Sequence, residues 1–464
     1  MYNPVSEQIV ERLREIVGPQ YVLMAQDALE PYSHDETAGL SAWPEVVVRA
    51  NSAQEVSEIL KLANEERVPV TPRGGGQGLS GGAVPVQGGI VLSLERMNRI
   101  LEIDHRNLMA TIEPGVITGE LHRAVEAEGL FYPPDPASLD SCLMGGNIAE
   151  DAGGPRALKY GTTQDYVQGL EVVLPDGEIL QLGGKLIKNV SGYDLIHLIV
   201  GSEGTLAVVT KIIVKLLPFP KEQIDLLVPF DDIDTAADTV SAMIAQNVIP
   251  TTIEFMEREA VKASERMLDK EVPFSDAAAH LLIQLTGQRL DEVEAEMDVV
   301  GELCLDQGAL DVLVASDRPT RDRLWEARRM IIEAIAHESP MNHTEDISVP
   351  RSEIPAVLRG VREISERIGI RTICFGHAGD GNVHVNFLNP DLEEDLWEQR
   401  LEEAQQALYD LTLSLGGAIT GEHGIGAIRQ KYLVQALGES AVEIMRRIKA
   451  SFDPNSILNP GKIF

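Results

Sequence analysis

A run of glycines between residues 73 and 82, RGGGQGLSGG, limits the folds open to this chain more than any other feature of its sequence. It contains the spacing GxGxxG at Gly76, Gly78 and Gly81, which in a dinucleotide-binding fold follows a strand and opens a helix. The preceding VPVTP suits a strand, but the following GAVPVQGGIVLSL has no helical pattern. We therefore reject a Rossmann NAD site here, and the lack of a GKS or GKT sequence excludes a nucleoside-triphosphate loop.

Glycines in such a loop leave successive backbone N–H groups uncovered, and these groups can form a nest for a phosphate. In so acidic a chain, these amides together with Arg73 would neutralise a pyrophosphate; the alternative is a glycine-rich connection without a ligand. Two more glycine-rich passages follow, at residues 133–167 and 183–210. Small residues at three places indicate that the backbone comes close to a large ligand. A flat cofactor with a diphosphate tail fits this pattern better than a small substrate.

Length and charge narrow the class of protein. A chain of 464 residues is expected to form two or three domains. Its 73 acidic and 39 basic residues give a net charge of −34. Nucleic acid and anionic membrane are therefore not expected partners, because both require a basic face. An acidic surface suits a soluble cytoplasmic protein or one with a basic protein partner.

The cysteines and the N-terminus point to the same class. Cys142, Cys304 and Cys374 are scattered and odd in number, so they form neither a disulfide framework nor a CxxC cluster for an iron–sulfur centre. Residues 1–18 read as an amphipathic helix without the apolar core of a signal peptide, and no run elsewhere approaches a membrane span. We expect a soluble, intracellular protein.

The pattern of apolar and polar residues along the chain changes at Pro220. Residues 1–40 read as polar and helical, and up to residue 220 short apolar strands are separated by glycine clusters. Long amphipathic segments then alternate with strands. This alternation favours an α+β domain with helices on one face of an antiparallel sheet. The expected domains are residues 1–40, 41–220, 221–415 and 416–464. The expected helices include 53–66, 119–129, 231–246, 289–307, 318–336 and 392–415, and the expected strands include 45–50, 67–73, 88–94, 224–230, 280–286 and 309–315.

The stretch FGHAGDGNVHVNF, residues 375–387, places two histidines seven residues apart around an Asp-Gly pair. Asp380-Gly381 is the preferred two-residue hairpin turn, in which both positions take positive φ. Such a turn would pair His377 with His384, and directly opposed side chains share a face with Cβ atoms roughly 5 Å apart. Asn386 would join that face. The stretch therefore suits a divalent metal; the alternative is a surface hairpin with two unrelated histidines.

Several motifs in order resemble one family. They are TPRGGGQGLSGG, PPDPAS, GGNIAEDAGG, KYGTT, GYDL, GSEGTL, GHAGDGNVHVN, TGEHGIG and the terminal LNPGK. Together they resemble the vanillyl-alcohol oxidase superfamily, and are most similar to its D-2-hydroxyacid dehydrogenase branch: the D-type subunit of glycolate oxidase, D-lactate dehydrogenase and D-2-hydroxyglutarate dehydrogenase. The resemblance covers nearly the whole chain. It implies an α+β fold, with a two-subdomain FAD-binding domain and an α+β substrate or cap domain built on an antiparallel sheet.

The resemblance implies which residues line the FAD. Covalent members of the superfamily bond a histidine of an RxGGH sequence to the flavin, whereas this chain has Gln77 at that position, so non-covalent FAD is expected. Arg73 to Gly78 would hold the pyrophosphate, and Asn459 would return the C-terminus to the flavin ring. The full implied set is Arg73, Gly74, Gly75, Gly76, Gln77, Gly78, Asp135, Ser138, Gly145, Gly146, Asn147, Gly153, Gly154, Glu203, Gly204, Val209 and Asn459.

The resemblance also implies a divalent metal (zinc, manganese or iron) held by His377, His384 and Glu422. Two imidazoles and one carboxylate leave coordination positions open for a substrate. Neighbouring Glu422 and His423 cannot easily ligate one ion together. His423 is therefore the expected general base, since histidine titrates closest to neutral pH.

A 2-hydroxyacid also needs a cation for its carboxylate. The resemblance implies Arg328, whose guanidinium binds carboxylates with two parallel hydrogen bonds; the alternative is an exposed helix arginine beside Arg323 and Arg329. Asn386 would hydrogen-bond the substrate. For the remaining histidines with no comparable context we expect core or surface roles: His105, His197, His337 and His343.

One departure from the family bears on the substrate. Hydroxyglutarate dehydrogenases have a threonine four residues after the arginine and a lysine just before a DLSLP-like strand. This chain has Ile332 at the first place, and residues 342–345, before DISVP, include no lysine. A second substrate carboxylate would lose its partners. We therefore expect a D-2-hydroxy monocarboxylate, D-lactate or glycolate, rather than D-2-hydroxyglutarate.

The expected reaction is oxidation to the 2-oxo acid, with a hydride passing to flavin N5. No motif for an electron acceptor is present, so electrons are expected to leave to a quinone, a cytochrome or a partner protein. Glycolate oxidase-type subunits or an electron-transferring flavoprotein suit the family, and such partners would place the protein at the periphery of the inner membrane. A homodimer is compatible with the sequence. Alternatives are a metal-dependent hydrolase using the same histidines, and a flavin-carrying subunit without catalysis of its own.

Overall fold

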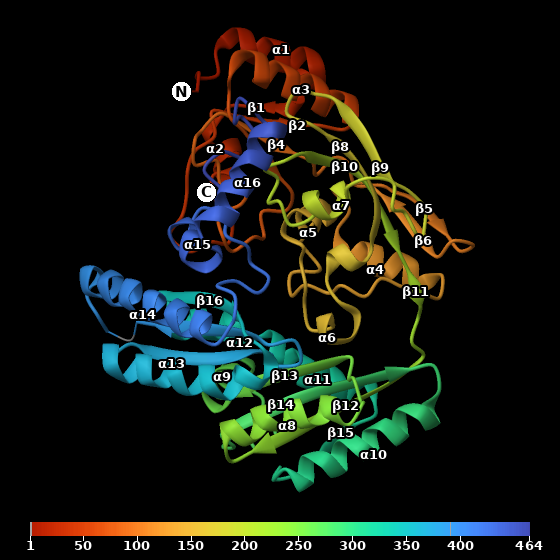
Figure 1. The fold of residues 1–464 in the computed structure, drawn as a ribbon, viewed down its shortest axis with the longest axis vertical. Helices are drawn as coiled ribbons and strands as arrows, with labels where there is room; N and C mark the ends of the chain where they lie inside the picture. The colour runs from red at the N-terminus through yellow and green to blue at the C-terminus, as the bar shows by residue number, and fades with distance from the viewer. Residues whose placement is uncertain (1, 390) are drawn as a thin grey trace. The chain divides into compact units, whose positions relative to one another are not determined.

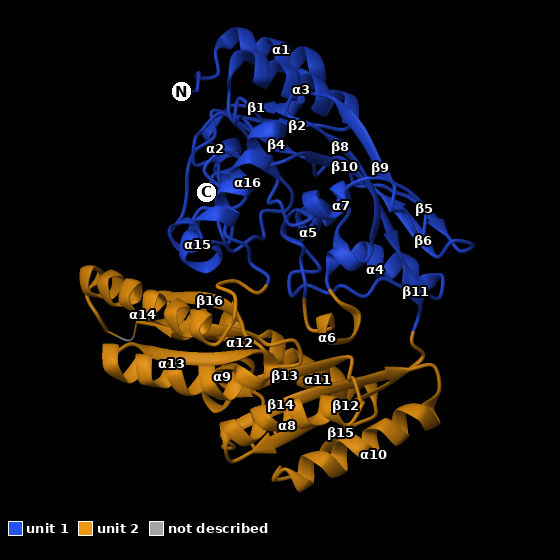
Figure 2. Cartoon of the chain, in the orientation of Figure 1, with its two compact units in different colours: residues 1–153, 162–219, 422–464 blue, residues 154–161, 220–421 orange. Residues whose placement is uncertain are grey.

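The computed structural model describes residues 2–389 and 391–464, which fold as two compact units (Figures 1 and 2). The first unit consists of Met1–Gly153, Thr162–Phe219 and Glu422–Phe464, and the second of Gly154–Gly161 and Pro220–Gly421. The chain therefore leaves the first unit after Phe219 and returns to it at Glu422.

The first unit begins with a four-stranded sheet in the order β1-β2-β4-β3. Strands β2, β4 and β3 are parallel, and β1 is antiparallel to β2. Helix α3 (Ala53–Glu66) packs with this sheet in one core, and it matches the predicted helix. Ser52 caps the start of α3, because its hydroxyl accepts a hydrogen bond from Glu55 N at 3.2 Å. The strands are β1 (Val22–Leu23), β2 (Val46–Arg49), β3 (Val70–Arg73) and β4 (Ile90–Ser93).

The first unit also contains a five-stranded antiparallel sheet, in the order β5-β6-β10-β8-β9, and a short pair, β11-β7. The strands are β5 (Ile100–Asp104), β6 (Met109–Ile112), β7 (Leu130–Phe131), β8 (Val167–Val173), β9 (Ile179–Gly183), β10 (Val208–Lys215) and β11 (Leu217–Pro218). The remaining helices are α1 (Glu7–Val17), α2 (Gln26–Leu29), α4 (Thr118–Ala127), α5 (Met144–Glu150), α7 (Leu195–Ile199), α15 (Gln430–Leu437) and α16 (Glu439–Phe452), with 3-10 turns at Pro19–Tyr21, Glu30–Tyr32 and Thr163–Asp165.

The second unit is built on a seven-stranded, fully antiparallel sheet in the order β15-β12-β14-β13-β17-β18-β16. Its strands are β12 (Glu222–Phe230), β13 (Thr252–Glu257), β14 (Ala279–Gly287), β15 (Leu313–Ala315), β16 (Asn342–Ser348), β17 (Arg371–His377) and β18 (Asn382–Leu388). Its helices are α6 (Ala157–Tyr160), α8 (Ile233–Ala245), α9 (Arg258–Leu268), α10 (Leu290–Asp306), α11 (Arg318–Arg329), α12 (Ile331–Glu338), α13 (Ile354–Ile368) and α14 (Glu394–Ser414), with a 3-10 turn at Arg351–Glu353.

Helices cover both faces of this sheet, so the prediction of one covered face was wrong. Helices α9, α11 and α12 share a core with Leu227, Leu282 and Phe375 on one face. Neighbours such as Leu226 and Leu281 point to the other face and are also fully buried, where α8 and α10 pack on β12 and β14. The physical reason is in the strands themselves. IDLLVPF is apolar at every position except Asp225, so both of its faces must leave water. The segment predicted as one helix, residues 318–336, is two, α11 and α12.

The hairpin of β17 and β18 has a different register from the predicted one. His377 pairs with Asn382, and His384 pairs with Phe375, so the loop contains residues 378–381 rather than a two-residue turn. Only Gly381 of the Asp-Gly pair has positive φ, at 91°, and Gly381 N donates to the His377 carbonyl oxygen at 3.2 Å. The shift is two residues, which is one full period of a strand. His377 and His384 therefore still share a face, because Asn382 and His384 lie two residues apart on the same strand.

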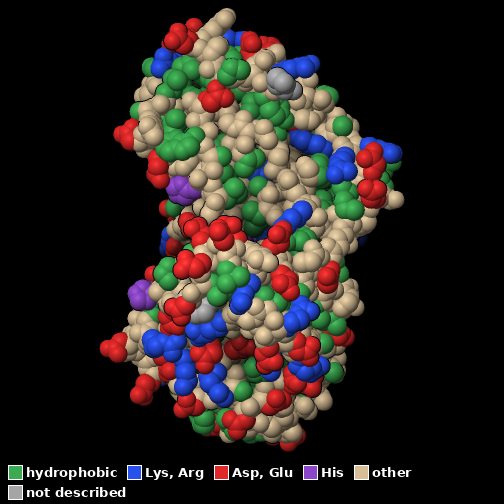
Figure 3. Space-filling model, turned by 90° about the vertical axis from the view of Figure 1, so that its left-hand side faces the viewer, with side chains coloured by type: hydrophobic (Ala, Val, Ile, Leu, Met, Phe, Trp, Pro, Cys, Tyr) green, Lys and Arg blue, Asp and Glu red, His purple; other side chains and the backbone are tan. Residues whose placement is uncertain are grey.

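Charge on the surface is mixed. On the face shown in Figure 3, acidic and basic side chains are interspersed rather than sorted into patches of one sign. Among the helices of the described ranges, none has the length and apolar character that a membrane crossing requires.

Candidate active site

Two of the glycine-rich segments predicted to line the FAD lie against each other in the first unit. The Ser141 hydroxyl donates to Gln77 Oε1 at 3.0 Å. A Cβ atom added at Gly75 would lie 2.9 Å from the Ser141 carbonyl oxygen, and one at Gly74 would lie 3.4 Å from Gly146 N. A side chain at position 75 would force the two segments apart, so the close approach of the two backbones requires glycine there.

Arg73 lies beneath this loop rather than on it. Its guanidinium donates to the carbonyl oxygens of Pro31 at 2.9 Å and His34 at 2.8 Å, and its side chain is buried. A Cβ atom at Gly76, where φ is 72°, would lie 2.1 Å from Arg73 Nη2. The loop therefore wraps around the guanidinium, and Arg73 fixes the shape of the loop through carbonyl contacts.

Asn459 joins three parts of the first unit that are far apart in the sequence. Its side-chain amide donates to the carbonyl oxygens of Gly82 at 3.0 Å and Glu203 at 2.7 Å. Its backbone N–H donates to Val70, the first residue of β3, at 2.7 Å. The terminal LNPGK thus returns to the glycine loop and to GSEGTL.

The implied FAD residues, with one exception, belong to the first unit. Gly154 is the exception, since it opens the 154–161 segment grouped with the second unit. The chain offers what an FAD pyrophosphate needs: a glycine-rich loop of backbone amides, and open space where a Cβ of Gly146 would project, with no atom within 4 Å. The residues present therefore fit the cofactor. Those in the first unit are Arg73, Gly74, Gly75, Gly76, Gln77, Gly78, Asp135, Ser138, Gly145, Gly146, Asn147, Gly153, Glu203, Gly204, Val209 and Asn459.

The carboxylate of Glu203 has a role that the sequence did not indicate. It accepts hydrogen bonds from Ile425 N at 2.8 Å and Gly426 N at 2.7 Å, directly after the EHG sequence. Burial raises the pKa of Glu203, although these backbone N–H groups and the cation of Lys462 oppose the rise. Burial also lowers the pKa of Lys462 to about 8. Glu203 therefore holds the chain segment that follows Glu422 and His423.

The second unit places a row of polar side chains on one face of its sheet. Strand pairing puts Glu254 opposite His377 and Asp346 opposite His384. The rings of His377 and His384 are 5.3 Å apart between centroids, at an interplanar angle of 86°. Both imidazoles are buried. Two of the three predicted metal ligands are thus adjacent, at a separation suited to one cation.

Glu254 connects two predicted site residues, and sequence reasoning missed it. Its Oε1 is 2.7 Å from His377 Nδ1. Its Oε2 accepts from Arg328 Nε at 2.7 Å and Nη2 at 2.6 Å. Burial alone would raise the pKa of Glu254, but Arg328 and His377 lower it to about 2, so this carboxylate is ionised. Arg328 is also stacked on the Phe375 ring, 4.7 Å from its centroid, and is buried rather than exposed on its helix.

Asp346 and Asn386 complete the face. Asp346 accepts from Asn382 Nδ2 at 2.6 Å and from Thr420 Oγ1 at 3.0 Å. Gly421 N also donates to Asp346, at 2.9 Å. The Asn386 amide accepts from Thr344 at 2.8 Å and donates to the Ile373 carbonyl oxygen at 3.0 Å, so it is held by the sheet.

Gly421 is the last residue of the second unit, and Glu422 and His423 follow it in the chain as the first residues of the returning segment. Their predicted roles as ligand and base stay predictions. Three of the other histidines each lie beside a carboxylate. His105 Nε2 is 3.0 Å from Glu128 Oε2, His197 Nδ1 is 2.6 Å from Asp194 Oδ2, and His343 Nε2 is 2.9 Å from Glu345 Oε1.

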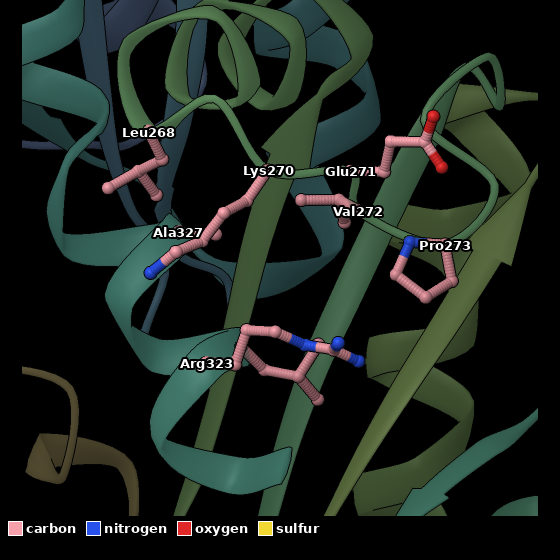
Figure 4. A pocket seen from close by; sticks show the side chains of 8 residues that line it. Leu268, Lys270, Glu271, Val272, Pro273, Arg323 and Ala327 are labelled. Atoms are coloured by element: carbon pink, nitrogen blue, oxygen red, sulfur yellow. The ribbon is translucent and has the colours of Figure 1, made fainter. Parts of the chain in front are cut away.

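A hollow on the second unit involves none of the predicted site residues (Figure 4). It is lined mainly by apolar groups, and the Lys270 ammonium beside it is paired with Glu326 at 2.8 Å. The lining residues are Leu268, Lys270, Glu271, Val272, Pro273, Arg323, Leu324 and Ala327.

Solved structures confirm the predicted fold. The chain is similar to p-cresol methylhydroxylase with substrate bound, with a TM-score of 0.81 and 20% identity over 98% of this chain and 96% of that one. The chain therefore belongs to the vanillyl-alcohol oxidase class of folds.

Sequence comparisons place the chain within that class. Residues 44–183 match the FAD binding domain, and residues 219–463 match the C-terminal domain of FAD linked oxidases. Glycolate oxidase subunit GlcD of Bacillus subtilis is 43% identical over 99% of this chain and 97% of its own length. A D-lactate dehydrogenase of Archaeoglobus fulgidus is 43% identical over 94% of this chain and 95% of its own. The chain belongs to the family of FAD linked oxidases, as its motifs predicted, and its cofactor is FAD. The metal-dependent hydrolase alternative is set aside.

Proposed function

We propose that this chain oxidises a D-2-hydroxy monocarboxylate, D-lactate or glycolate, to the 2-oxo acid with non-covalently bound FAD and a divalent metal. The observation that carries the proposal is the polar face of the second unit. There two buried imidazoles lie 5.3 Å apart between ring centroids, beside a buried arginine held by Glu254. The similarity to a glycolate oxidase subunit and a D-lactate dehydrogenase supports this substrate class.

The metal ligands and the base have separate parts in this reaction. His377, His384 and Glu422 would hold the metal, which supplies a Lewis acid that lowers the pKa of the substrate hydroxyl. Bound FAD supplies the two-electron oxidant that takes up the hydride from C2. His423 accepts the hydroxyl proton on an imidazole nitrogen, help that is typically worth about 10²–10⁴ in rate.

Arg328 orients the substrate carboxylate. Two of its contacts go to Glu254 Oε2, and a guanidinium carries five N–H donors. Donors therefore remain for a second carboxylate.

The hydroxyl proton and the C2 hydride together account for the two hydrogens lost when a 2-hydroxyacid becomes a 2-oxo acid.

The preference for a monocarboxylate rests on the neutral character of nearby positions. Asn342 and Thr344 alternate with Asp346 along β16 and share its face, and neither carries a positive charge. The Ile332 side chain is 45% exposed on α12. A second carboxylate buried beside Asn342 and Thr344 without a charged partner would cost roughly 1–3 kcal/mol.

The same comparison supports a proposal for the route of the electrons. The relative from Bacillus subtilis is named as a subunit of glycolate oxidase. We propose that electrons leave this chain to a partner protein, either glycolate oxidase-type subunits or an electron-transferring flavoprotein, with a quinone or cytochrome as the alternative acceptor. The cysteines at positions 142, 304 and 374 are all buried thiols.

Anaerobic titration of the metal-replete protein with D-lactate, followed by flavin absorbance, tests the proposal. D-lactate or glycolate should bleach the flavin, L-lactate should not, and His384→Ala should abolish bleaching. His343→Ala is the matched control, since His343 lies on the neighbouring strand but on the opposite face. A protein without flavin, or equal bleaching by L-lactate, would overturn the proposal. Stronger bleaching by D-2-hydroxyglutarate would overturn the choice of a monocarboxylate.

A further inference from the structure

Glu254 is a carboxylate on the polar face that contacts both a predicted metal ligand, His377, and the predicted substrate arginine, Arg328. Its side chain is fully buried on β13, and strand pairing sets it directly opposite His377. Its two oxygens make separate contacts. Oε1 meets His377 Nδ1 at 2.7 Å, and Oε2 meets Arg328 Nε and Nη2.

The contact with His377 decides which ring nitrogen can bind a metal. A carboxylate only accepts hydrogen bonds, so His377 Nδ1 must carry the proton. The lone pair of the neutral ring then lies on Nε2, the nitrogen that faces away from Glu254. Partners of this kind fix the tautomer and orientation of a metal-binding histidine, and their loss typically costs about 10–100-fold in metal affinity.

The contact with Arg328 determines which N–H donors of the guanidinium already bind Glu254. Nε and Nη2 both bind Oε2 of Glu254, so a substrate carboxylate would meet the remaining donors. Phe375 supports the guanidinium from its ring face. One side chain therefore sets the direction of the arginine and of the histidine together.

We propose that Glu254 is a positioning residue that presents His377 Nε2 to the metal and Arg328 to the substrate carboxylate, so that its loss weakens both. This inference rests on the proposed function. The inference predicts that loss of Glu254 weakens the binding of both the metal and the substrate carboxylate, although Glu254 itself contacts neither. An ion pair with only a structural role would not produce this coupled loss.

Glu254→Gln tests the inference with nearly unchanged volume. Glu257→Gln is the matched control, because Glu257 lies three residues on in β13 and on the opposite face, where it accepts from Cys374 N at 3.0 Å. Zn²⁺ retention would be measured by metal analysis after dialysis against graded chelator. Pyruvate affinity at saturating Zn²⁺ would be read from the perturbation of the oxidised flavin spectrum.

Glu254→Gln should lose Zn²⁺ at about 10–100-fold lower chelator concentration and should bind pyruvate more weakly, while Glu257→Gln behaves as the unmodified protein does. Equal Zn²⁺ retention in both variants would overturn the inference and leave the proposed function intact. Failure of the unmodified protein to retain Zn²⁺ would instead overturn the metal part of the proposed function.

A second measurement needs no substitution at Glu254. Nitrogen NMR of the metal-free protein, with His377→Ala for assignment, reports which ring nitrogen of His377 is protonated. Protonation at Nδ1 supports the inference, and protonation at Nε2 alone would overturn it.

Discussion

Glu257 shows how burial changes a single carboxyl group. It lies at the end of β13, and burial raises its pKa to about 7 against the hydrogen bond from Cys374 N and the charge of Arg362. The folded protein therefore holds a proton on Glu257 at a pH where the unfolded chain has lost it. The stability that this group contributes is fully present below pH 4.5 and is lost as pH rises through 7.

Glu257→Gln should remove this pH dependence. The free energy of unfolding of the variant, relative to the unmodified protein, should increase between pH 5 and pH 8 by roughly 2–3 kcal/mol, from 1.36 kcal/mol per pKa unit. Glutamine can still accept from Cys374 N, so the fold should persist. Urea unfolding at several pH values measures the difference, and a difference that does not vary with pH would contradict the pKa assignment.

At the scale of elements, the hairpin of β17 and β18 separates what a pattern can predict from what it cannot. The sequence predicted a hairpin with both histidines on one face, and the structure has both features. The register was wrong, because the Asp-Gly rule considers only the turn. Here the segment that follows β16 packs against the loop: a Cβ at Gly381 would lie 2.0 Å from the Val349 carbonyl oxygen.

Gly381→Ala should therefore cost more than a glycine replacement that meets only backbone strain. Gly416 is the matched control, since its φ of 75° is also positive but its Cβ would meet no atom within 4 Å. We expect roughly 1–2 kcal/mol for Gly416→Ala from the left-handed conformation, and about 1–3 kcal/mol more for Gly381→Ala from overpacking. Urea unfolding measures the free energy of unfolding of the two variants. Equal losses would show that the contact with the Val349 carbonyl oxygen does not contribute to the loss of stability.

The sheet of the second unit was predicted as antiparallel, but its covered faces were not. Alternation of apolar and polar residues marks a half-exposed strand. HLLIQLT alternates at all positions but Leu282, whereas IDLLVPF gives no alternation. Such runs are compatible with a sheet buried on both faces, as here. On the other strands β13, β17 and β18, the polar residues Glu254, His377 and His384 stand among apolar ones, and they mark the site.

At the scale of the whole molecule, the FAD-binding unit depends on contacts between distant parts of the chain. Asn459 joins the glycine loop at Gly82 to Glu203, and motif resemblance predicted that the C-terminus returns to this region. Glu254 could not be predicted in the same way. Its role depends on strand pairing between segments far apart in the sequence, and nothing local in TTIEFME separates Glu254 from Glu257 as a site residue.

Asn459→Ala should destabilise the FAD-binding unit. It leaves the buried carbonyl oxygen of Glu203 without the amide donor, at roughly 1–3 kcal/mol, and it also removes the part-buried contact with Gly82. It places alanine at a φ of 42°. Asn455→Ala is the control, because Asn455 makes a part-buried contact with Asn64 at 2.8 Å. The temperature of FAD release, followed by flavin fluorescence, should fall for Asn459→Ala and stay nearly unchanged for Asn455→Ala. Equal release temperatures would show that the return of LNPGK does not hold the unit together.

We propose that FAD oxidises a D-2-hydroxyacid only when a metal is held by the histidines of the second unit. The most direct measurement is anaerobic addition of D-lactate to the FAD-containing protein before and after chelator treatment, with Zn²⁺ or Mn²⁺ then restored. We predict that the chelated protein keeps its flavin absorbance unbleached and that restored metal permits bleaching. Full bleaching of the metal-free protein would contradict the claim.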